Sequence, residues 1–151
     1  METLTEDQYG MCVKVKNHLY TMDKDRKMII RFSEDGKDKK ELYPVEDLKD
    51  TDLKTDGTYL YLYTRKCIQK EEDSVISGTV QAIDTEGNPV DTLKDTDAFV
   101  GGDDTFLFFQ KIEEEYSEES GQEESVKHMY YYKKSDLGSG DYSLRKEMKP
   151  E

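Results

Sequence analysis

The chain has 151 residues and a net charge of −13, because 35 Asp and Glu outnumber 22 Lys and Arg. This length fits one domain, expected over residues 1–151, that buries a core without help from disulfides or metal. An acidic surface repels phosphate, which excludes nucleic acid as a generic partner and favours a protein partner with a basic surface.

The amino-terminal segment has no targeting signal that the sequence reveals. Met1–Tyr20 carries charges throughout and lacks the apolar run of a secretory signal, and no stretch approaches the ~18 apolar residues of a membrane span. Cys12 and Cys67 lie outside any CxxC or Cys/His spacing, which predicts reduced thiols. We therefore expect a monomer with no membrane insertion and no disulfide framework.

Short strands account for most of the ordered chain. The tyrosines of Thr58–Arg65 alternate with leucines, which predicts a strand with one buried face and one half-wet tyrosine face. No window shows the apolar spacing of an amphipathic helix, and the Glu-rich run Lys111–Glu124 is interpreted as a solvated loop. Clusters of β-branched and aromatic residues predict strands at Met11–Lys16, His18–Met22, Met28–Phe32, Thr58–Arg65, Val75–Ile83, Phe106–Phe109 and Met129–Tyr132, with a short edge near Leu42 and Val45.

An internal repeat with an offset of 45 residues organises the chain. Tyr43–Asp52 and Asn88–Asp97 are identical at seven of ten positions, and the surrounding units cover about 28–66 and 80–111, with a fainter third copy at 126–148. A unit of a few short strands cannot bury its own apolar face, so like units are expected to pack about a common axis. This predicts an all-β fold, a β-trefoil-like barrel of short strands with long acidic loops. Two tandem SH3-like or Tudor-like barrels are the alternative.

A family resemblance rests on the second copy of the repeat and the strand that follows it. These residues are Asn88-Pro89, Asp91, Lys94-Asp95-Thr96 and Phe108-Phe109-Gln110-Lys111. They resemble the interleukin-18 branch of the interleukin-1 superfamily, and the earlier copy is weakly similar to interleukin-33 through Glu41, Tyr43 and Val45–Lys49. The resemblance implies a β-trefoil cytokine that is exported without a signal peptide and binds immunoglobulin-like receptor ectodomains.

Catalytic and metal-binding signatures are not evident in the sequence. His18 and His128 lie outside any GxSxG-like motif, so we expect no enzyme activity and no cofactor. Asp50, Asp52 and Asp56 precede Gly57 but lack the remaining ligands of a Ca²⁺ loop, so no metal site is expected. Acidic loops instead raise encounter rates with basic partners. Receptor contacts are expected at Asp50, Asp52, Asp95, Asp97, Asp103, Asp104, Glu113 and Glu114.

These expectations combine into one leading function and one alternative. The leading hypothesis is a secreted, cytokine-like signalling protein, extracellular after synthesis in the cytosol, that binds immunoglobulin-like ectodomains through acidic loops. The alternative is an acidic cytoplasmic inhibitor or adaptor made of two small barrels, with nucleic-acid mimicry as one form of it.

Overall fold

The computed structural model describes residues 9–46, 50–70 and 73–148, and describes the backbone alone at 9–11, 66–70 and 73–76. Within these ranges the chain forms twelve β-strands and two single-turn 3₁₀ helices, Lys134–Asp136 and Tyr142–Leu144. The predicted all-β class is confirmed. Neither short helix, nor any other helix of this part of the chain, has the length and apolar character that crossing a bilayer requires.

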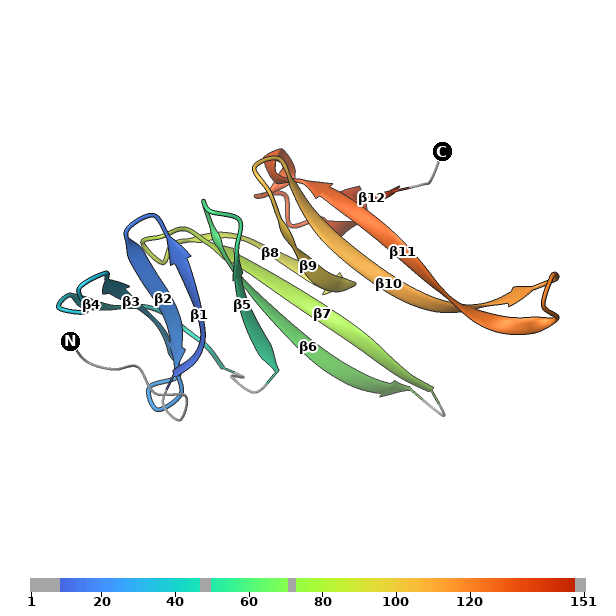
Figure 1. Cartoon of the computed structure of the whole chain (residues 1–151), viewed down its shortest axis with the longest axis horizontal. Helices are drawn as coiled ribbons and strands as arrows, with labels where there is room; N and C mark the ends of the chain where they lie inside the picture. Colours follow the sequence, from blue (N-terminus) through green and yellow to red (C-terminus); the bar gives the residue numbers. More distant parts are fainter. Residues whose placement is uncertain (1–8, 47–49, 71–72, 149–151) are drawn as a thin grey trace.

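The strands form three antiparallel four-stranded sheets that follow one another along the long axis of the molecule (Figure 1). The first sheet contains β1 (Tyr9–Val15), β2 (His18–Asp23), β3 (Met28–Ser33) and β4 (Lys39–Pro44). The second contains β5 (Thr51–Thr55), β6 (Leu60–Lys70), β7 (Asp73–Ile83) and β8 (Pro89–Thr96). The third contains β9 (Ala98–Gly102), β10 (Phe106–Ser117), β11 (Gln122–Lys133) and β12 (Lys146–Met148).

Each sheet is a meander in which strands that are consecutive in sequence pair with each other. Over the described ranges none of the three sheets closes on itself, so the pairing shows open sheets where the sequence predicts a barrel. The three open sheets also do not divide into two small barrels. The residues that the structure describes contain twelve strands, in three groups of four.

The second sheet is buried on both faces because it lies between the other two. Leu60 and Leu62 of β6 pack in a cluster with residues of the first sheet such as Ile29. Tyr61 and Tyr63 point the other way, into a cluster with aromatic residues of the third sheet. The expectation of a half-wet tyrosine face was therefore wrong: Tyr61 is 0% and Tyr63 3% exposed.

The strands that the sequence missed lie at sheet edges. No strand was predicted at β5, β8, β9 or β12, and each of them is the outer strand of its sheet. Edge strands hydrogen-bond on one side only and tolerate charged residues, which also discourage pairing with other chains. The Lys, Asp and Thr residues of β5 and β8 therefore masked their extended conformation, whereas β9 ends in two glycines and β12 is only three residues long.

The sequence repeat spans the boundary between sheets. The unit at 28–66 runs from β3 to β6, and the unit at 80–111 runs from within β7 to within β10, so each begins in one sheet and ends in the next. Equivalent threonines, Thr51 and Thr96, are both buried. The prolines differ, because Pro44 ends β4 whereas Pro89 begins β8. Residues 47–49 of the first copy lie outside the described residues.

The Glu-rich run is a hairpin and not the solvated loop that its composition predicts. β10 and β11 pair without interruption from Phe106 opposite Lys133 to Ser117 opposite Gln122. Leu107, Phe109 and Tyr132 at the base of the hairpin are fully buried. This base holds the register, and the ladder then carries the glutamates outward to one end of the molecule (Figure 1).

Candidate functional site

The hairpin β10–β11 directs its side chains alternately to two faces. Glu113 and Glu115 lie on one face, and the register of β10 and β11 places His128 on that same face. Ile112 and Tyr116 lie on the opposite face and are 62% and 68% exposed. The hairpin therefore separates a cluster of charged groups from a surface with two exposed apolar side chains.

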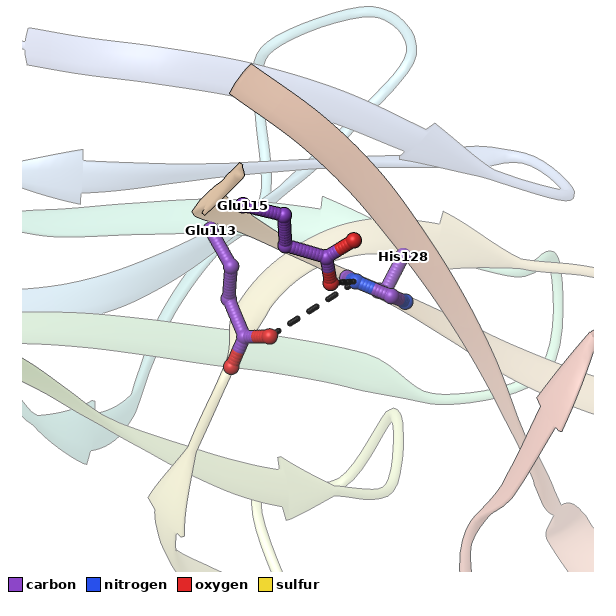
Figure 2. Close-up of side chains that lie close together, drawn as sticks. All are labelled: Glu113, Glu115 and His128. Atoms are coloured by element: carbon purple, nitrogen blue, oxygen red, sulfur yellow. Dashed lines mark hydrogen bonds and ion pairs between the residues drawn. The ribbon is translucent and has the colours of Figure 1, made fainter. Parts of the chain in front are cut away.

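His128 lies among three carboxylates that come from the two strands beside β11. Figure 2 shows the two from β10, Glu113 and Glu115. Its Nε2 is 2.9 Å from Glu115 Oε1 and 3.6 Å from Glu113 Oε2. Its Nδ1 is 2.8 Å from Oε1 of Glu147, which belongs to the edge strand β12. An imidazolium donates from both ring nitrogens, so a carboxylate at each nitrogen favours the protonated form of His128.

The carboxylates account for the protonation behaviour of His128. The hydrogen bond to Glu147, and then that to Glu115, raise the pKa of His128 above its usual value. The ring is 20% exposed and both carboxylates are more open to solvent, so water screens part of this attraction.

Lys111 is a second cation on the same face. Its Nζ is 2.8 Å from Glu113 Oε1, and this bond raises the pKa of Lys111 and lowers the pKa of Glu113. Glu113 therefore divides its two oxygens between Lys111 and His128. The face is a small network of alternating charges rather than a uniformly negative patch.

The predicted receptor-contact aspartates are distributed over several elements. Asp50 lies in the turn before β5, Asp52 lies in β5, and Asp95 is near the end of β8 with a φ of 56°. Asp103 and Asp104 lie between β9 and β10, where Asp103 Oδ1 accepts the amides of the turn. Asp52, Asp95, Glu113 and Glu114 are thus in strands, whereas the sequence predicts acidic loops.

Two of these aspartates come close to one buried tyrosine. Burial raises the pKa of Tyr63, and the nearby carboxylates of Asp52 and Asp97 add to this effect. Asp97 is 16% exposed, accepts a 2.7 Å hydrogen bond from the Tyr142 hydroxyl and lies 3.5 Å from Arg145 Nε. Its carboxylate therefore serves contacts within the chain.

From the sequence, His128 was considered only as a catalytic candidate, and Glu115 and Glu147 were given no role. The pattern that reveals them is alternation: in a hairpin, acids at every second position of one strand share a face with a histidine of the other. Because Lys111–Glu124 was interpreted as a loop, the alternation of its side chains was not used to predict this cluster.

Comparison with known proteins identifies no relative of this chain. It matches no family model, no curated protein and no solved structure.

Proposed function

We propose that this chain is a binding protein that recognises a protein receptor with a basic surface, in the manner of a secreted cytokine. The observation that carries the proposal is the outer face of the β10–β11 hairpin, which is the face opposite His128. There Tyr116 and Ile112 stand exposed on the same face of β10 as Glu114. Aromatic side chains inside a polar rim are the usual anchors of protein interfaces.

The charge of the hairpin supports this choice of partner. Residues 111–124 contain seven glutamates and one lysine, and the chain as a whole has a net charge of −13. Such a surface steers a basic partner into encounter and repels an acidic one. The exposed tyrosine then supplies the contact area that charge alone does not.

The resemblance to the interleukin-18 branch supports the more specific proposal. In this more specific proposal, the receptor is an immunoglobulin-like ectodomain and the protein acts outside the cell after leaderless export. The three sheets are then units of a β-trefoil-like arrangement. Twelve strands in three groups of four match the strand number of such a fold. Appearance of the uncleaved protein in culture medium is the expected result that tests the export.

Binding kinetics with a panel of interleukin-1-receptor-type immunoglobulin ectodomains test the receptor proposal. Tyr116→Ala is expected to weaken binding about 30-fold, as loss of an interface anchor worth about 2 kcal/mol does. Val100→Ala is the matched control, because Val100 is also an exposed apolar strand residue but lies on β9. Equal affinities for the two variants, or no binding to any ectodomain, would refute this role for the hairpin.

A second candidate function is an acidic inhibitor or adaptor that acts in the cytoplasm. The glutamates of residues 111–124 favour this function, because carboxylates spaced along a strand can occupy a surface that otherwise binds phosphates. Retention in the cytosol, with competition between this chain and DNA for a basic protein, would support this function over the cytokine.

A further inference from the structure

We propose that Glu113, Glu115 and His128 form a binding site for a divalent transition-metal ion of the zinc type on the inner face of the β10–β11 hairpin. One ligand atom from each of these residues lies within 4.8 Å of the other two (Figure 2). Within the described part of the chain, this is the one group of His, Cys, Asp and Glu side chains that meets this condition.

The distances suit a single ion. Zn²⁺ bonds to nitrogen and oxygen at about 2.0–2.2 Å, which separates neighbouring ligand atoms of a tetrahedron by about 3.3 Å. The observed separations from His128 Nε2 are 2.9 Å to Glu115 and 3.6 Å to Glu113, on either side of that value. Adjustments of a few tenths of an ångström in long, half-exposed side chains are sufficient, and the paired strands hold the backbone.

Glu147 supplies the outer contact that metal-binding histidines normally have. Its carboxylate accepts a hydrogen bond from Nδ1 of His128, at 2.8 Å, on the opposite side of the ring. This hydrogen bond fixes the ring orientation and leaves Nε2 directed at the two ligand carboxylates. Because Glu147 is on β12 and the other two glutamates are on β10, the site connects three strands of the third sheet.

The donor set selects the class of metal. One imidazole nitrogen and two carboxylates suit Zn²⁺ and neighbouring transition metals, whereas Ca²⁺ requires six to eight oxygens and Mg²⁺ an octahedron of oxygens. Three protein ligands leave a fourth position for water. The ion displaces the proton on Nε2 and competes with Lys111, whose Nζ is 2.8 Å from Glu113.

Titration of the full chain with Co²⁺, followed by its visible absorption, tests the proposal without any receptor and so does not depend on the proposed function. A one-to-one complex with intensified d–d bands is expected, and Zn²⁺ should displace the Co²⁺. His128→Gln should weaken binding at least 100-fold, and Glu147→Gln about 10- to 100-fold through loss of the outer contact. Lys111→Met should tighten binding, since it frees Glu113.

Two matched controls define the outcome. His18→Gln removes the other histidine, on β2, and Glu114→Gln removes a glutamate from the opposite face of β10; both should bind Co²⁺ as the unaltered chain does. Glu115→Gln carries the test if His128→Gln fails to fold. Unchanged affinity in the ligand variants, binding only at millimolar Co²⁺, or a thiolate-to-cobalt charge-transfer band would overturn the proposal.

Discussion

At the scale of single residues, Asp56 connects the second and third sheets. Its carboxylate, in the turn between β5 and β6, is fully buried and lies 2.6 Å from Nζ of Lys134, which follows β11. It also accepts the Tyr61 hydroxyl and the amide of Tyr59. From the sequence, Asp56 was noted only as part of an incomplete calcium loop, and no metal was expected there. The structure pairs its carboxylate with Lys134 of the same chain.

The substitution Asp56→Asn should destabilise the protein, because it leaves the Lys134 ammonium buried without its partner. We expect Asp56→Asn to lower the free energy of unfolding by about 3 kcal/mol, the cost typical of breaking a buried pair. Urea unfolding at neutral pH measures it. The double variant Asp56→Asn/Lys134→Met should recover part of the loss, and an equally unstable double variant would contradict this account.

The same carboxylate predicts a dependence of stability on pH. Burial alone raises the pKa of Asp56, but the hydrogen bonds from Lys134 and Tyr61 outweigh it and hold the pKa below its usual value. A lowered folded-state pKa stabilises the protein fully above the pKa of the unfolded chain, about 3.9, and this contribution is lost as the pH falls through the folded value. The difference in unfolding free energy between the unaltered chain and Asp56→Asn should therefore shrink below about pH 4. A constant difference down to pH 2 would contradict it.

At the scale of elements, the β10–β11 hairpin shows how register overrides composition. Glu115 lies directly opposite Glu124, a like-charge pair that disfavours the strand conformation. The hairpin persists because its base is anchored in the core and its end is closed by Gly121, whose amide donates to the Ser117 carbonyl at 2.8 Å. Gly121 has a φ of 69°, which a residue with a side chain adopts only at a cost.

Gly121→Val should loosen the outer half of the hairpin and leave the core intact. A β-branched residue in the left-handed region costs about 1–2 kcal/mol, so amide exchange at residues 113–117 should quicken about 5- to 30-fold. Hydrogen exchange of the variant measures this. Lys127→Ala, at an exposed position on β11, is the control, and equal exchange in both variants would contradict the role given to the turn.

At the scale of the whole molecule, the second sheet joins two apolar clusters. The first cluster packs β6 against the first sheet, and the second packs the other face of β6 against the third sheet. Phe99 is central to the latter: its ring centroid lies 5.4 Å from that of Tyr61 and 5.3 Å from that of Phe109. Because β6 belongs to both clusters, loss of either one is expected to affect the entire chain.

Phe99→Ala should lower the free energy of unfolding by about 3–5 kcal/mol, since it leaves a cavity among aromatic rings. Urea unfolding should show one transition by both tyrosine fluorescence and circular dichroism. Val100→Ala, at the adjacent exposed position, should change stability by less than about 0.5 kcal/mol. Separate transitions for the two clusters would show that they unfold independently.

The central strands were predictable because their signal is local. Met28–Phe32 and Val75–Ile83 are rich in apolar and β-branched residues, and they correspond to β3 and β7. The edge strands β5, β8, β9 and β12 and the outer hairpin were not predicted from composition, because hydrogen bonds to a neighbouring strand hold them extended. The cluster around His128 depends on that same pairing, since residues far apart in sequence meet only through the register.

The amino-acid sequence by itself determined the all-β class and the acidic character, because these follow from side-chain chemistry and short-range alternation, and it showed two clear copies of one segment. The tertiary structure decided which strands pair, that the tyrosine face of β6 is covered, and that His128 meets Glu113, Glu115 and Glu147. The reason is physical: a strand satisfies its backbone and buries its side chains only against partners that the rest of the fold supplies.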